Sequence, residues 1–216
     1  MAQNLLALWN IALASVGERS LASTSTSTEN VESLRLLNEV WTRGRGAVSY
    51  VLEQGLWSFA VARSAPTVTT STAAFGHAFS FALPTDFVRL VEISSTADMR
   101  DPLLRYEFET TKIYADSSIV YLRYVSSSTA FGGDLARWPD SFALYAGHWL
   151  GTQVAPRMRN EIDHELLGKR TSELLASARF KDMARGKRPW PPLSPGSVDH
   201  EYIDFIIDMM ALRRST

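Results

Sequence analysis

The sequence predicts an α+β fold that is mainly α. We expect a four-helix bundle core with an inserted small antiparallel β-sheet and an extended C-terminal arm ending in a helix. Apolar residues recur every three or four positions in four segments, as on one side of a helix. Between the second and third segments, short runs alternate apolar and polar residues, as strands with one buried face do. Near the end, residues 186–197 contain four of the nine prolines, which excludes a helix or central strand there.

The first helix is expected over about residues 3–16, with Gly17 as a natural stop. This N-terminal segment is apolar enough to resemble a signal peptide. It lacks a basic start, and Asn10 interrupts the apolar run, so we interpret it as a structural helix. No stretch of the sequence reaches the ~20 apolar residues of a membrane span.

The second helix is expected over about residues 28–54, and we interpret it as a spine along which the other helices pack. At ~1.5 Å per residue it would be about 39 Å long, which is unusual for a globular protein. Thr26 and Glu29 have the spacing of a capping box near its start. Gly44 and Gly46 lie within one turn at its middle, which suggests a kink or a close helix contact.

A β-rich insertion is expected over about residues 65–126. Its strand candidates are short and closely spaced, which is typical of an antiparallel meander. They cover residues 79–83, 87–93, 106–108, 112–115 and 119–125.

The last two helices of the core are expected over about residues 139–155 and 160–185, which closes a main domain of residues 1–188. Pro139 suits a first helical turn. Gly147 and Gly151 are four residues apart and would let another helix approach closely, so we assign them to core packing.

The C-terminal arm, residues 189–216, combines the proline-rich segment with an apolar helix over about 198–214. A helix this apolar needs a surface to cover it. Its own domain is one option, and we favour a neighbouring subunit or another partner, because a proline-rich tether suits a reaching arm. The expected partner-binding residues are Trp190, Leu193, Tyr202, Ile203, Phe205, Ile206, Met209 and Met210.

Residue patterns typical of catalysis or metal binding do not occur, so we predict no catalytic residues, no metal, no cofactor and no enzymatic activity. The chain has no cysteine and only four histidines, His77, His148, His164 and His200. No two of these histidines have metal-ligand spacing. An acid/base pair brought together only by the fold stays possible from sequence alone.

The overall charge is close to neutral, with a formal net charge of −1 and a pI near 6.4, which argues against a dedicated nucleic-acid binder. Two local basic clusters stand out as possible contacts to nucleic acid or to an acidic protein partner. They comprise Arg43 with Arg45, and Arg179, Lys181, Arg185, Lys187 and Arg188. A DNA-binding or packaging accessory protein that uses these clusters is the alternative function.

Several short motifs, in their order, resemble the tail tubular protein A family, the head-to-tail adaptor (connector) proteins of short-tailed bacteriophages and related particles. Residues 10–18, NIALASVGE, are similar to the opening of that family. Residues 55–59, GLWSF, resemble its aromatic segment after a long helix, and residues 83–89, LPTDFVR, resemble its Leu-Pro-x-Asp-Phe-x-Arg motif. Trp138 and Pro139 before Phe142 resemble the start of its third helix. The resemblance covers about residues 5–183 and leaves the arm unmatched.

The resemblance implies a structural virion protein. Members of that family form a homo-oligomeric ring, here expected to hold about twelve copies in cyclic symmetry, under the portal protein. They prolong the DNA channel and dock tail tube or nozzle proteins. DNA would be passing cargo only, no membrane would be involved, and the protein would lie in the neck or tail after assembly in the host cytoplasm.

Overall fold

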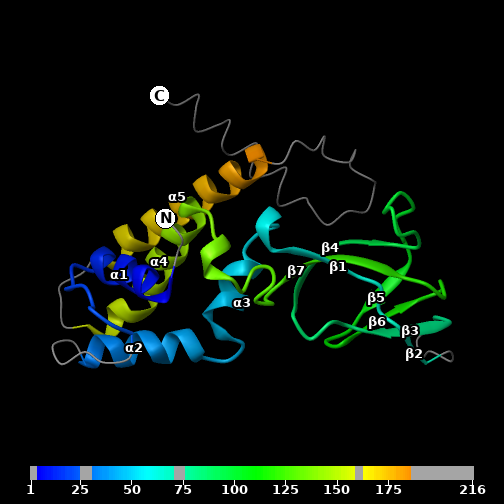
Figure 1. Ribbon diagram of the computed structural model, residues 1–216, viewed down its shortest axis with the longest axis horizontal. Coiled ribbons are helices and arrows are strands. Elements are labelled where there is room, and N and C mark those ends of the chain that lie inside the picture. Colours follow the sequence, from blue (N-terminus) through cyan, green and yellow to red (C-terminus); the bar gives the residue numbers. More distant parts are fainter. Residues whose placement is uncertain (1–3, 25–30, 71–75, 159–162, 186–216) are drawn as a thin grey trace. The chain divides into compact units, whose positions relative to one another are not determined.

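The structure is a computed structural model that describes residues 4–24, 31–70, 76–158 and 163–185 (Figure 1). Its helices are α1 (Leu5–Ser15), α2 (Val31–Thr42), α3 (Gly46–Glu53), α4 (Asp140–Val154) and α5 (His164–Arg185), with short 3-10 helices η1 (Ser58–Ala60), η2 (Leu135–Arg137) and η3 (Ala155–Arg157). Its strands are β1 (Val61–Ser64), β2 (Val68–Thr70), β3 (Phe79–Ala82), β4 (Phe87–Ser94), β5 (Tyr106–Phe108), β6 (Lys112–Ala115) and β7 (Tyr121–Ser126).

The fold is an α+β mixture, and the prediction of a four-helix bundle core is wrong. The described residues form five α-helices and seven strands in two antiparallel sheets. The first sheet has the order β1-β7-β4 and the second has the order β2-β3-β6-β5. Sequence alternation marked the strands, but it carries no information on which strands pair, so one inserted sheet was expected where there are two.

The spine helix expected over residues 28–54 is two helices. Helix α2 ends at Thr42 and α3 begins at Gly46. Gly44 has φ of +59° and Gly46 has φ of +85°, in the left-handed region that glycine enters without steric cost. Backbone of this kind cannot continue a right-handed helix, so the two glycines break the helix where a kink was expected. The capping box at Thr26 and Glu29 lies outside the described residues.

Helices α1 and α4 pack closely through the two glycines of α4. A Cβ atom on Gly147 would collide with the Ile11 side chain, and one on Gly151 would collide with the Ser15 hydroxyl. The core-packing interpretation of these glycines is therefore confirmed. The helical core around them holds large buried side chains from all five helices, among them Leu8, Trp9, Leu37, Leu52, Phe142 and Leu174.

Strand β7 is shared between two hydrophobic cores. Leu122 and Tyr124 are buried in the core between the two sheets, where Phe81 and Ile113 of the second sheet also lie. Val125 is buried in the helical core instead. Since successive residues of a strand point to opposite faces, β7 joins the sheets on one side and the helices on the other.

Candidate functional site

The C-terminal arm residues expected to bind a partner lie outside the described residues, so the structure does not place Trp190, Leu193 or any residue of the apolar segment. The described residues do contain the helix that leads to the arm. The candidate site is therefore built from the last turns of α5 and the segment on which they pack.

The last turns of α5 are fixed to residues 54–58, the segment between α3 and η1. Asp182 is buried, with 7% of its surface exposed. Its carboxylate accepts a hydrogen bond from the Ser58 backbone N–H at 2.8 Å and one from the Ser58 hydroxyl at 2.7 Å. Arg179 donates to the Gln54 carbonyl through Nε at 2.9 Å and through a second guanidinium nitrogen. We call these contacts of Asp182 and Arg179 the α5 anchor.

The same segment is held from the other side by β4. Arg89 donates to the Glu53 carbonyl at 3.3 Å, and Arg45 donates to the Phe87 carbonyl at 2.8 Å. The last carbonyls of a helix need donors, and Arg89 and Arg179 supply them at the end of α3, whereas Arg45 ties the start of α3 to β4. Residues 53–58 are therefore clamped between α5 and the sheet, so the base from which the arm leaves is a rigid part of the fold.

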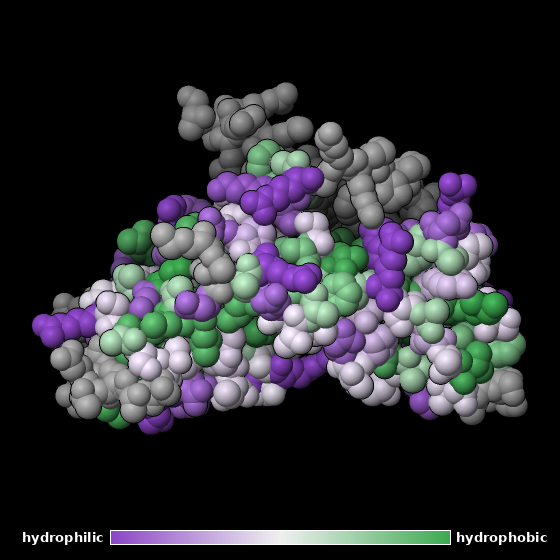
Figure 2. Space-filling model, in the orientation of Figure 1, coloured by the Kyte–Doolittle hydropathy of each residue, from purple (hydrophilic) through white to green (hydrophobic). Residues whose placement is uncertain are grey.

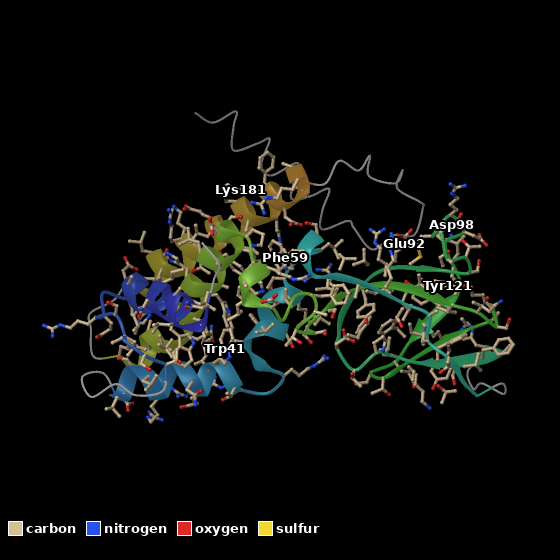
Figure 3. All side chains as sticks on the ribbon, viewed as in Figure 1. Trp41, Phe59, Glu92, Asp98, Tyr121 and Lys181 are labelled. Atoms are coloured by element: carbon tan, nitrogen blue, oxygen red, sulfur yellow. The ribbon has the colours of Figure 1, made fainter. Side chains whose placement is uncertain are left out.

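Aromatic side chains pack together next to residues 53–58. Trp57 meets Phe142 at a ring-centroid distance of 4.6 Å, and Trp138 meets Phe142 at 4.7 Å. Phe59 packs on Phe142 at 5.0 Å and lies between the helices and the sheets in Figure 3. The GLWSF segment and the Trp138 motif thus meet at one point, although about eighty residues separate them in the sequence.

The LPTDFVR segment has two structural roles. Asp86 accepts hydrogen bonds from the Tyr124 hydroxyl at 3.1 Å and from the Ser126 hydroxyl, so it ties the turn before β4 to β7. Burial and the adjacent Asp86 charge raise the pKa of Tyr124 to about 12. Arg89 of the same segment reaches the end of α3, as described above. The motif therefore joins β7 to the start of β4 within the first sheet, and it joins β4 to helix α3.

The predicted basic clusters do not form one patch among the described residues. Arg43 pairs with Glu39 at 3.0 Å, whereas Arg45 binds the Phe87 carbonyl. Arg179 belongs to the α5 anchor. Lys181 and Arg185 are exposed near the end of α5, where Figure 3 labels Lys181. Lys187 and Arg188 lie outside the described residues.

Glu39 is a meeting point of arginines that the sequence analysis missed. Its carboxylate contacts Arg157 at 2.6 Å, Arg43 at 3.0 Å and Arg35 at 3.3 Å. Hydrogen bonds from Arg157 and then Arg43 lower the pKa of Glu39. The spacing of Arg35, Glu39 and Arg43 in the helix was a usable signal, but the partner from η3 stands 118 residues further on.

The histidines occupy separate parts of the described structure. His77 is buried, with its Nδ1 atom 3.3 Å from the Asp116 carboxylate. His148 lies on α4, where burial and then the charge of Arg170 lower its pKa. Among the described residues, no three His, Cys, Asp or Glu side chains gather as a metal site requires. A depression of about 190 Å³ is lined by Arg63, Met99 and Tyr121, among other residues.

Comparison with models of protein families and with the sequences of curated proteins finds no match to this chain. The described helices include none that is both long and apolar enough to cross a bilayer.

Proposed function

We propose that the chain is a structural subunit of a ring-forming head-to-tail adaptor, which joins a portal to a tail and prolongs the DNA channel. The order of elements supports this, since helices precede and follow a β-rich region as in the tail tubular protein A family that the sequence resembles. The resembling motifs also have joining roles in this chain. Asp86 links the turn before β4 to β7, and Arg89 links β4 to the end of α3. Trp57, Trp138 and Phe142 pack together.

The observation that carries the proposal is the distribution of exposed apolar side chains. Large apolar residues that stand more than a third exposed occur both on the helical part and on the sheet-bearing part of the chain. The helical ones are Val31, Tyr50, Leu144, Leu166 and Phe180, and those of the sheet-bearing part are Val68, Leu104, Phe108 and Ile119. On the face in Figure 2, the hydrophobic residues form several patches separated by hydrophilic ones.

Such a distribution suits a ring subunit. In a cyclic ring every interface is heterologous, so each copy uses two different surfaces to meet its two neighbours. A subunit with apolar side chains on two different parts can supply both surfaces. The α5 anchor adds a rigid base for the C-terminal arm, because a tether transmits force to a partner only if its base is fixed.

Electron microscopy of assembled particles that contain the protein tests the proposal. We expect a ring of this chain between the capsid portal and the tail, in the neck of a virion or a related particle. A mass measurement of the assembled form would give the number of copies. Absence of the protein from the particle, or a position away from the neck, would refute the proposed function.

A further inference from the structure

Tyr50 of α3 and Trp149 of α4 form a partly exposed aromatic stack. Their ring centroids are 4.7 Å apart and their planes are inclined by 22°. Tyr50 is 48% exposed, and Trp149 is half-buried against the helical core. The ring contacts of Phe142 with Trp57 and Trp138 lie among buried residues instead. The stack of Tyr50 and Trp149 is thus a rigid, accessible aromatic surface.

One exposed carboxylate lies next to this stack along α3. Glu53 is exposed and follows Tyr50 by three residues, so the two side chains lie on neighbouring positions of the same helix face. Arg89 holds the backbone carbonyl of Glu53, which fixes the end of the helix that carries the carboxylate. An accessible aromatic pair with a carboxylate beside it matches a ligand that combines flat apolar rings with a neighbouring cation.

Proline-rich segments in the polyproline II conformation are ligands of this type. They dock on surfaces lined by aromatic side chains because the apolar proline rings pack on aromatic faces and the preformed extended chain loses little entropy on binding. Residues 187–195 of this chain read KRPWPPLSP, two cations followed by four prolines within seven residues. The cations complement Glu53, and the prolines complement the aromatic stack. In polyproline II the nine residues would span ~28 Å, long enough to cover both.

We propose that the surface formed by Tyr50, Trp149 and Glu53 binds residues 187–195 of a second copy of this chain. The second copy is favoured over the same copy because a stiff, proline-rich segment suits an arm that reaches away from its own domain. The inference goes beyond the adaptor role and does not require it, since it concerns only how copies bind one another.

A mixing experiment with the full chain tests the proposal. One variant carries Tyr50→Ala, which removes the stack and keeps the segment. The other carries Pro191→Ser and Pro192→Ser, which alters the segment and keeps the stack. With a different tag on each, we expect each variant alone to associate at least about tenfold more weakly than the wild type by analytical ultracentrifugation. We expect the mixture to form heterodimers, because only a mixed pair contains one intact stack facing one intact segment.

The control is Glu173→Ala, which shortens an exposed side chain of α5 that belongs neither to the stack nor to the segment, and it should leave self-association unchanged. Unaltered association of the Tyr50→Ala variant, or a mixture that forms no heterodimers, would overturn the proposal. A wild-type chain that stays monomeric at about 100 μM would overturn it too.

A charge exchange gives a second test that does not disturb the packing of the stack, because Glu53 is exposed. Glu53→Lys and Arg188→Glu should each weaken self-association, and the doubly substituted chain should recover it in part at low salt. Circular dichroism would verify that each variant is folded. If the double variant is as weak as the single ones, the assignment of residues 187–195 to this surface is wrong. A ring seen by electron microscopy would still support the adaptor role in that case.

Discussion

Asp182 near the end of α5 accepts two hydrogen bonds from Ser58, a residue 124 positions earlier in the chain. The contact closes the fold, since it attaches the last described helix to the segment where the helices give way to the sheet. A buried carboxylate with two short hydrogen bonds is costly to disturb, because its removal leaves the Ser58 N–H and hydroxyl without their acceptor.

We expect Asp182→Ala to lower the free energy of unfolding by about 2–3 kcal/mol, because hydrogen bonds to a charged group are the strong ones. Ser58→Ala should cost about 1 kcal/mol, since it removes one of the two bonds. Urea unfolding of both variants and of the double variant measures their coupling. Glu173→Ala, which breaks an exposed ion pair with Arg170 on the same helix, is the control and should change stability by less than about 1 kcal/mol. Additive losses from Asp182→Ala and Ser58→Ala would contradict the α5 anchor.

Alanine at the two glycines of α4 should separate α1 from α4. We expect Gly147→Ala and Gly151→Ala each to reduce the unfolding free energy by about 1–3 kcal/mol, because the added methyl group collides with Ile11 or Ser15. Gly168→Ala in α5 is the matched control. A Cβ there meets nothing within 4 Å, so this change should stabilise the protein by up to about 1 kcal/mol. Thermal unfolding of the three variants distinguishes packing from helix propensity, and equal effects at all three sites would refute the close contact.

The break between α2 and α3 should depend on the left-handed backbone of Gly44. We expect Gly44→Ala to destabilise the protein by about 1 kcal/mol, although nothing lies within 4 Å of the added Cβ, because an L-residue at φ of +59° is strained. Gly44→Asn is the comparison, since asparagine tolerates this conformation better, and it should cost less. A stabilising Gly44→Ala would mean that α2 and α3 can merge into one helix.

The Tyr124–Asp86 contact should make stability fall at high pH. The pKa of Tyr124 is about 12 in the folded chain against an ordinary tyrosine value of 10.0, so the folded chain keeps a proton that the unfolded chain loses between these two values. The stabilisation is complete below pH 10 and is lost as pH rises towards 12. Tyr124→Phe should flatten this part of the pH dependence of urea unfolding.

Tyrosinate absorbance supplies an independent measurement of the same contact. Asp86→Asn should lower the pKa of Tyr124, because the carboxylate charge is one of the causes of the raised value. A titration of Tyr124 that does not respond to Asp86→Asn would show that burial alone sets its pKa.

Removal of residues 189–216 should leave a folded core that no longer attaches to its partner. The α5 anchor and both hydrophobic cores lie within residues 1–186, so thermal unfolding of the shortened chain should resemble that of the full chain. Pull-down of portal or tail components compares the two chains. Unchanged assembly by the shortened chain would contradict the assignment of attachment to the arm.

The elements that could be predicted from the sequence are those with local signals. The helices expected over residues 3–16, 139–155 and 160–185 correspond to α1, α4 and α5, because helical periodicity and glycine or proline stops depend only on neighbouring residues. Gly44 and Gly46 mark a weak point in the helical pattern, because glycine destabilises a helix. That destabilisation alone does not reveal that the backbone φ angle is positive at both residues. Pairing of β7 with β1 and β4, instead of β6, depends on residues that are distant in sequence.

The candidate site was harder to predict for the same reason. Arg179 was assigned to a basic cluster, and its partner, the Gln54 carbonyl, is a backbone atom 125 residues earlier that no residue pattern can reveal. Asp182 is the single acid within that basic segment, and no residue pattern marks it as buried. Its burial against Ser58 becomes visible only when the two segments are brought together by the fold.

The packing of α1 on α4 has a consequence for the order in which the chain folds during synthesis. Leu8, Trp9 and Ala12 of α1 are buried in the helical core. The two glycines of α4 on which α1 packs, Gly147 and Gly151, follow more than 125 residues later in the chain. A ribosome adds about 5–20 residues per second, so α1 stays without its native partner for roughly 6–25 s. Helix α1 can therefore dock on α4 only after α4 has been synthesised, and a chaperone that shields an apolar N-terminal helix would act in that interval.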